Sequence, residues 1–205
     1  MNTKTIILVL LLIHTIIFIY VVGGDTSVVD VDGGQVQANT KYYIFTPRGG
    51  GLALSVRDRR QPCPPNVMQE ADGASMGLPL KIFPADGKAV IDLQSDLNLA
   101  FMAATTCVQR TVWRLGDTDW NTGRRYVRSD GVVGNPGVET VRNWFKMERF
   151  GKQGYKIVYC PSVCRACRVE CGDVGVLVES GRRWLAVGGQ PLLIAFKKLN
   201  HSISY

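Results

Sequence analysis

Histidine is nearly absent from this sequence: its 205 residues include two histidines, His14 and His201. Nucleophilic catalysis by a Ser-His or Cys-His pair needs an imidazole that a third group holds in place. His14 lies in an apolar run near the N-terminus and His201 lies close to the C-terminus, so neither suits this chemistry or a His-ligated zinc, copper or iron site. We therefore expect no catalytic residue, no metal site and no cofactor.

Signals for phosphate binding are also lacking. Gly49–Gly51 is not followed by the Gly-Lys-Ser/Thr of a phosphate loop, and we interpret these glycines as a flexible turn between strands. Paired carboxylates for sugar hydrolysis stay open as an alternative because Asp is plentiful, but the sequence singles out no pair.

The basic excess has no single concentrated stripe. The net charge is +7, from 24 Lys and Arg against 17 Asp and Glu. Nucleic-acid binders concentrate basic residues on one face, whereas dispersed doublets are typical of a solvated surface, so we expect no nucleic-acid partner. The doublets are Arg59-Arg60, Arg124-Arg125, Arg182-Arg183 and Lys197-Lys198.

One long apolar run is present, from Ile6 to Val22, after Lys4 and before the small residues Gly23 and Gly24. A basic head, an apolar middle and small residues at the exit are typical of a secretory signal peptide, although an uncleaved anchor is the alternative. We expect residues 1–24 to be removed, leaving one domain, residues 25–205, that is secreted to an extracellular or vacuolar compartment and has no membrane attachment.

All six cysteines follow the apolar run. An even number in an oxidising compartment indicates disulfides, and six cysteines allow 15 pairings, among which spacing alone does not choose. The last four have a spacing that resembles zinc or redox sites, but neither context is present, and we interpret them as structural. The six are Cys63, Cys107, Cys160, Cys164, Cys167 and Cys171.

Short alternating or apolar segments closed by turn residues make up the rest of the chain. This pattern predicts an all-β protein, a sandwich or a barrel. Asn200 begins an Asn-His-Ser triplet and is a candidate for N-glycosylation. The segments are 41–46, 96–102, 111–115, 144–148, 155–159, 174–178, 184–187 and 192–197, and turns are expected at 47–51, 134–137, 151–154 and 180–181.

A series of motifs along residues 28–198 resembles the plant Kunitz-type (soybean trypsin inhibitor) family. The cluster Cys-Pro-x2-Cys-x2-Cys-x3-Cys that begins at Cys160 is similar to its miraculin-like branch in particular. The motifs are Val28-x-Asp30-x-Asp32-Gly33, Tyr42-Tyr43-Ile44, Cys63-Pro64, Gly77-Leu-Pro-Leu80, Ser95-Asp-Leu-Asn98, Thr111-Val-Trp113, Gly134-x-Pro-Gly137, Asn143-Trp-Phe-Lys146, Tyr155-Lys-Ile-Val-Tyr-Cys-Pro161, Asp173-Val-Gly175, Arg182-Arg183 and Pro191-Leu192.

The resemblance implies a disulfide-stapled β-trefoil, in which twelve short strands form a six-stranded barrel and a hairpin cap. It also implies three bridges, Cys63–Cys107, Cys160–Cys171 and Cys164–Cys167. In the loop-entropy model, each bridge contributes about 2–4 kcal/mol by restricting the unfolded chain.

The resemblance further implies an inhibitor of serine proteases that acts in plant defence, with trypsin-like enzymes as the expected targets. If all six cysteines pair internally, no thiol remains for an intermolecular bridge, and we expect a monomer. Such inhibitors offer one exposed loop to the protease as a substrate would. The matching loop is Pro84, Ala85, Asp86, Gly87, Lys88, Ala89 and Val90, with the scissile bond at Gly87–Lys88 or Lys88–Ala89. We expect Lys88 to be the specificity residue, with Gly87 as the alternative.

One position departs from the family pattern. Family inhibitors usually carry an Asn that supports the loop from beneath, and here Ala38 occupies that position, with Asn39 one residue further along. Because side chains alternate along a strand, a shift by one residue points the amide away unless a bulge corrects it. The alternative function is therefore a non-inhibitory, miraculin-like binding or defence protein on the same fold, with a protein, a sugar or a cysteine protease as its ligand.

Overall fold

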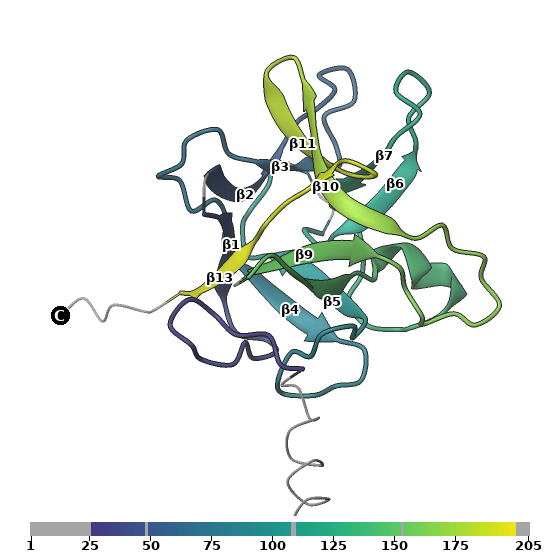
Figure 1. Ribbon diagram of the computed structural model, residues 1–205. Helices are drawn as coiled ribbons and strands as arrows, with labels where there is room; N and C mark the ends of the chain where they lie inside the picture. The colour runs from purple at the N-terminus through teal and green to yellow at the C-terminus, as the bar shows by residue number, and fades with distance from the viewer. Residues whose placement is uncertain (1–25, 48, 108–109, 153, 200–205) are drawn as a thin grey trace, which may run out of the picture.

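The computed structural model describes residues 26–47, 49–107, 110–152 and 154–199 (Figure 1). The signal peptide expected at 1–24 and the glycosylation candidate Asn200 lie outside the described residues. Within them, the chain forms thirteen strands and one short 3-10 helix, η1 (Val138–Asn143). The strands are β1 (Tyr42–Thr46), β2 (Gly49–Ser55), β3 (Asn66–Gln69), β4 (Leu80–Pro84), β5 (Leu97–Phe101), β6 (Arg114–Thr118), β7 (Arg125–Arg128), β8 (Lys146–Phe150), β9 (Gly154–Tyr159), β10 (Gly172–Glu179), β11 (Arg182–Val187), β12 (Gln190–Pro191) and β13 (Ala195–Lys198).

Six of these strands close into a barrel. β1 pairs with β4, β4 with β5, β8 with β9, and β13 with β1. Two bridges next to the strand ends complete the ring: Leu97 with Phe145 joins β5 to the start of β8, and Tyr155 with Ile194 joins β9 to the start of β13. A closed ring leaves no unpaired sheet edge.

Three hairpins cap one end of the barrel. They are β2–β3, β6–β7 and β10–β11, and their inner strands pair in a triangle of β3 with β7, β7 with β11, and β11 with β3. In Figure 1, the hairpin tips project upward from the barrel formed by β1, β4, β5, β9 and β13. A six-stranded barrel with a triangular hairpin cap is a β-trefoil, as predicted. The structure has one strand more than the predicted twelve because the two-residue β12 pairs with β10.

The core follows from alternation along the strands. In β1, Tyr42, Ile44 and Thr46 are buried while the residues between them are partly exposed, as expected where one face of a sheet packs inward. Trp113 is fully buried, with its ring 5.5 Å from that of Phe101 and 6.0 Å from that of Phe145. These aromatic contacts join β5, the segment before β6 and the segment before β8.

The Asn98 side chain connects three of the sequence motifs, those that contain Asn98, Gly134 and Asn143. It is completely buried in β5, and its amide nitrogen donates to the Asn143 carbonyl at 2.9 Å. Its amide oxygen accepts from the backbone N–H of Gly134 at 2.8 Å. One side chain thus forms hydrogen bonds with backbone groups of two distant loops. These bonds also satisfy the buried amide itself, which would otherwise incur a desolvation penalty.

The interpretation of Gly49–Gly51 as a turn is wrong, because all three glycines belong to β2. Their role is close backbone packing. A Cβ added at Gly51 would lie 1.9 Å from the Met76 carbonyl oxygen, and one at Gly50 would lie 2.4 Å from the Asp72 carbonyl oxygen. Glycine permits this approach because it has no side chain.

The three disulfides implied by the family resemblance are confirmed. Cys63 is bonded to Cys107, Cys160 to Cys171, and Cys164 to Cys167. No described cysteine is free. No helix in the described ranges is long and apolar enough to cross a membrane.

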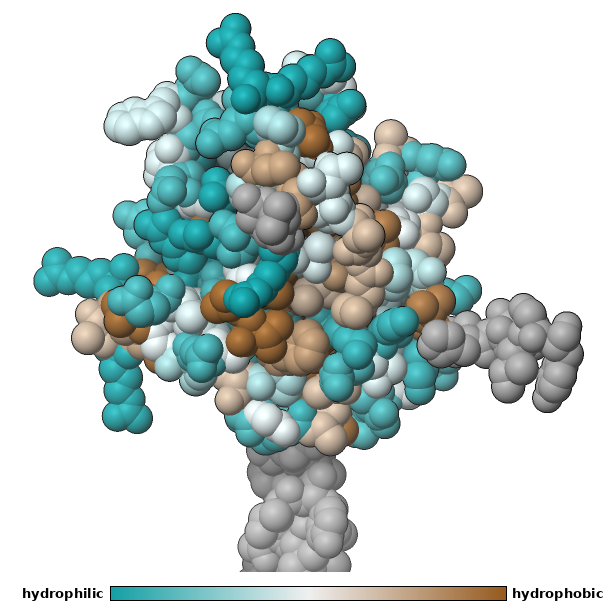
Figure 2. All heavy atoms as spheres, turned by 180° about the vertical axis from the view of Figure 1, so that it is seen from behind, coloured by the Kyte–Doolittle hydropathy of each residue, from teal (hydrophilic) through white to brown (hydrophobic). Residues whose placement is uncertain are grey.

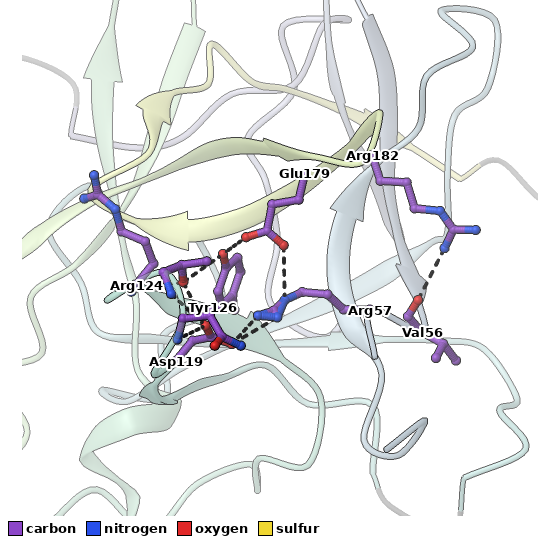
Figure 3. Close-up of polar contacts among 9 residues, drawn as sticks. Val56, Arg57, Asp119, Arg124, Tyr126, Glu179 and Arg182 are labelled. Carbon is purple, nitrogen blue, oxygen red and sulfur yellow. Dashed lines mark hydrogen bonds and ion pairs between the residues drawn. The ribbon is translucent and has the colours of Figure 1, made fainter. Parts of the chain in front are cut away.

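A polar cluster ties the three cap hairpins together (Figure 3). Arg57, from the β2–β3 loop, lies over the Tyr126 ring of β7 at 3.9 Å and donates to Asp119 of the β6–β7 loop. Its Nε lies 3.6 Å from Glu179 at the end of β10, and Tyr126 donates its hydroxyl proton to the same carboxylate. Burial and this hydrogen bond raise the pKa of the Tyr126 phenol. Arg57 therefore contacts both of the other two hairpins, β6–β7 through Tyr126 and Asp119 and β10–β11 through Glu179.

Arg57→Ala is expected to lower the free energy of unfolding by about 1–3 kcal/mol, because it removes a charge-assisted hydrogen bond and a cation–π contact from a half-buried cluster. Urea unfolding of the oxidised protein measures the change. Arg57→Lys, which keeps the charge without the planar stacking, should show an intermediate loss. Equal stabilities of Arg57→Ala and the parent protein would contradict a stabilising role for the cluster.

The basic doublets are dispersed over the surface, as expected. Arg59, Arg124 and Arg182 are exposed on three different hairpins, and Lys197 is exposed on β13. Figure 2 shows hydrophilic residues over much of the visible face, with apolar residues in smaller areas between them.

Candidate functional site

The predicted loop leaves β4 at the barrel end opposite the hairpin cap. β4 and β5 pair in continuous antiparallel register from Leu80 with Phe101 to Pro84 with Leu97. In Figure 1 their connection lies at the bottom of the view, while the hairpin tips lie at the top. The ladder brings the start and the end of the connection to one place on the barrel rim.

The first half of the loop is a tight turn. The Ala85 N–H donates to the Asp96 carbonyl at 2.8 Å, and the Gly87 N–H donates to the Pro84 carbonyl at 3.3 Å. Gly87 has a φ of +69°, in the left-handed region that favours glycine. A residue with a side chain would be strained at this position, although a Cβ there would meet no atom within 4 Å.

The second half of the loop pairs with the N-terminal segment. The Ala38 N–H donates to the Ala89 carbonyl at 2.8 Å, and the Ile91 N–H donates to the Val36 carbonyl at 2.8 Å. Between these bonds, Val90 forms a bridge with Gln37. Ile91 is completely buried and anchors this half of the loop to the core.

Asn39 contacts β4 through its backbone. Its N–H donates to the Ile82 carbonyl at 2.9 Å, and its φ is +58°. Its side chain is exposed, and no hydrogen bond within the described residues joins that side chain to the loop. Ala38 packs against the core cluster. The described contacts between this segment and the loop are the backbone pairing of residues 36–38.

Lys88 lies in the exposed span between the two supported halves. Residues 85–89 are all exposed, and the Lys88 side chain is 58% exposed. Its N–H donates to Asp86 Oδ1 at 3.1 Å, and its Nζ donates to Asp92 Oδ2 at 2.7 Å, with Asp86 Oδ2 at 3.5 Å. The hydrogen bond and ion pair with Asp92, assisted by Asp86, raise the pKa of the Lys88 ammonium above its usual 10.5.

Asp92 contacts Lys88 of the candidate loop, and the sequence analysis did not single it out. The available signal was the spacing of four residues between Lys88 and Asp92, which brings opposite charges together in a helix but has no fixed meaning in a loop. Here the reversal of the chain at residues 84–92 creates the contact.

The loop has the general properties of a substrate presented to an enzyme: it is exposed, supported at both ends, and carries one cation. No group of three or more metal-ligating side chains occurs in the part of the chain that the structure describes.

Comparisons with known proteins identify the family of this chain. Residues 28–198 match the legume Kunitz family model, described as trypsin and protease inhibitor. The chain is 41% identical over 181 residues to miraculin from Synsepalum dulcificum, covering 83% of this chain and 82% of that protein. It is 39% identical over 172 residues to Kunitz trypsin inhibitor 5 from Arabidopsis thaliana, covering 82% and 84%.

The solved structure of the Kunitz-type cysteine protease inhibitor PCPI-3 from potato superposes with a TM-score of 0.73 at 28% identity, covering 86% of this chain and 98% of that one. The match of the family model and of the relatives' sequences over most of the length shows that this chain belongs to the plant Kunitz family of trypsin and protease inhibitors.

Proposed function

We propose that this protein inhibits trypsin-like serine proteases by presenting residues 84–90 as a substrate, with Lys88 in the specificity pocket. The observation that carries this proposal is the exposure of a cationic side chain on a loop supported on both sides. Several relatives bear the names of inhibitors, among them Kunitz trypsin inhibitor 5 and an alpha-amylase/subtilisin inhibitor, which supports a role in inhibition.

The acidic pocket of a trypsin-like enzyme suits an ammonium group, because a charge-assisted hydrogen bond in a desolvated pocket is strong. Little ordering entropy is lost on binding, since the β4–β5 ladder and the 36–38 segment already hold the loop. After cleavage, the same contacts would keep the two new chain ends close together. The reverse reaction would then compete with release, and the complex would persist.

The scissile bond that fits best is Lys88–Ala89. The alternative, Gly87–Lys88, would place a residue without a side chain at the pocket. Lys88 also directly precedes Ala89, whose carbonyl is bonded to Ala38, so the chain on the leaving side of the bond is anchored.

We further propose that residues 25–205 form the mature domain, released by cleavage of a signal peptide, and that it acts outside the cytoplasm as a monomer in plant defence. The apolar run before residue 25 supports secretion, and the three internal disulfides are consistent with an oxidising compartment.

A second candidate is a binding or defence protein on the same fold that does not inhibit serine proteases. The ion pairs of Lys88 with Asp86 and Asp92 favour it, because they occupy the ammonium that a pocket would need. Its ligand would be a cysteine protease, another protein or a sugar.

Titration of bovine trypsin with the oxidised protein, expressed from the full sequence in a secretory host, tests the main proposal. We expect stoichiometric inhibition, and mass spectrometry of the secreted product should give an N-terminus near Asp25. The same titration with papain examines the second candidate. Absence of trypsin inhibition by correctly oxidised protein would reject the serine protease proposal.

A further inference from the structure

Lys88 is held by two carboxylates of its own loop. Asp92 accepts from the ammonium at 2.7 Å, while Asp86 accepts from the Lys88 N–H at 3.1 Å and lies 3.5 Å from the ammonium. The side chain therefore folds back along the loop in the free protein.

Asp92 is the fixed member of this ion pair. Its side chain is 23% exposed, against 58% for Lys88. Asp92 forms a backbone bridge with Ser27, and it lies between the buried Ile91 and Leu93, whose N–H donates to the Thr26 carbonyl at 2.7 Å. Lys88 can swing away from this position, whereas Asp92 stays on the body of the protein.

Binding in an acidic pocket would require Lys88 to leave both carboxylates. The ammonium cannot contact Asp92 and a recessed enzyme carboxylate at once, because the pocket receives an extended side chain. Asp92 and the enzyme thus compete for the same cation.

We propose that Asp92 is a specificity-determining residue that retains the Lys88 side chain on the inhibitor and so weakens binding to proteases with an acidic pocket. This inference rests on the proposed function, in which Lys88 is the pocket residue. Asp86 makes a smaller contribution to the restraint, since its carboxylate lies farther from the ammonium.

Asp92→Asn is expected to lower the inhibition constant for trypsin by about 2- to 5-fold, the size expected for an exposed ion pair that no longer has to be broken. The gain should shrink in 1 M salt, where the parent ion pair is already screened. Asp32→Asn is the matched control: it makes the same change in net charge at an exposed aspartate that has no described contact with Lys88. It should leave the inhibition constant unchanged.

A double-mutant cycle shows whether Asp92 acts through Lys88. Inhibition constants are measured for the parent, Asp92→Asn, Lys88→Ala and the double variant. We expect the Asp92→Asn gain to vanish in the Lys88→Ala background. An equal gain in inhibition from Asp92→Asn in the Lys88→Ala background would overturn the proposal. The absence of any gain from Asp92→Asn alone would also overturn it, if Lys88→Ala is a weak inhibitor.

A second readout needs no protease. Asp92 raises the pKa of Lys88, so Asp92→Asn should lower that pKa and increase the neutral amine fraction at a given pH. Acylation of Lys88 by acetic anhydride at pH 8.5, followed by peptide mass spectrometry, should therefore be faster in Asp92→Asn and unchanged in Asp32→Asn.

The two readouts separate the two ways of failing. Unchanged acylation in Asp92→Asn would reject the restraint by Asp92. Faster acylation combined with undiminished trypsin inhibition by Lys88→Ala would instead reject Lys88 as the pocket residue, and the specificity role of Asp92 with it.

Discussion

Lys88→Ala is expected to raise the inhibition constant for trypsin by about 30- to 1,000-fold, because one pocket residue supplies much of the binding energy in such interfaces. The substitution removes the ammonium that the acidic pocket would bind. It leaves the Lys88 N–H in place, as well as the backbone bonds that hold residues 85, 89 and 91. Inhibition kinetics with a chromogenic substrate measure the change.

Two controls accompany this variant. Lys88→Arg keeps a cation of suitable length and should inhibit trypsin within about 10-fold of the parent, since guanidinium and ammonium groups both pair with carboxylates. Lys197→Ala removes an equivalent charge from the exposed strand β13 and should have no effect. If Lys88→Ala inhibited as well as the parent protein, the contact with trypsin would have to lie elsewhere on the surface.

Trp113→Ala is expected to cost about 3–5 kcal/mol of unfolding free energy, because it opens a cavity at the centre of the aromatic core. Trp113 is fully buried between Phe101 and Phe145. The backbone N–H of Trp113 donates to the Leu99 carbonyl at 2.7 Å, and this bond stays in the variant, so the expected loss comes from the side chain. Urea unfolding with the disulfides intact measures the loss.

Trp113→Phe separates packing from hydrogen bonding in this core. The indole N–H of Trp113 is buried and has no hydrogen-bond partner among the described residues. Replacement by Phe removes this unsatisfied donor while keeping an aromatic ring, so we expect a smaller loss, below about 1.5 kcal/mol. A loss as large as that of Trp113→Ala would show that the ring fit matters more than the unsatisfied donor.

Much of the fold could be predicted from the sequence through its local signals. The pattern of residues 41–46 predicted a strand, and Ser180–Gly181 predicted a turn; the structure has strand β1 at the first and the turn between β10 and β11 at the second. The prediction of a turn at Gly49–Gly51 was wrong, because these glycines belong to strand β2. Turn residues are glycines because of their backbone freedom, but a strand also needs glycine wherever another backbone segment passes close to it.

The loop position was predictable, and its internal contacts were not. The resemblance predicted that Lys88 lies in an exposed loop before Asp96, and in the structure Lys88 is exposed in the loop between β4 and β5. The competing roles of Asp86 and Asp92 stayed hidden because loop conformation decides which neighbouring charges meet. Likewise, the Asn39 side chain was considered as loop support, whereas the described support is backbone pairing by residues 36–38.

The all-β class, the family and the exposed basic residue could be predicted from the amino-acid order, because alternation, turn chemistry and motif order are local properties of the chain. Three contacts became apparent only in the folded protein: Asn98 joins two distant loops, Arg57 contacts the other two hairpins, and Asp92 holds Lys88. The first two contacts join residues far apart in sequence, and the third depends on the turn between its partners. Each exists only once barrel closure has set the loops in space, and no local pattern encodes that arrangement.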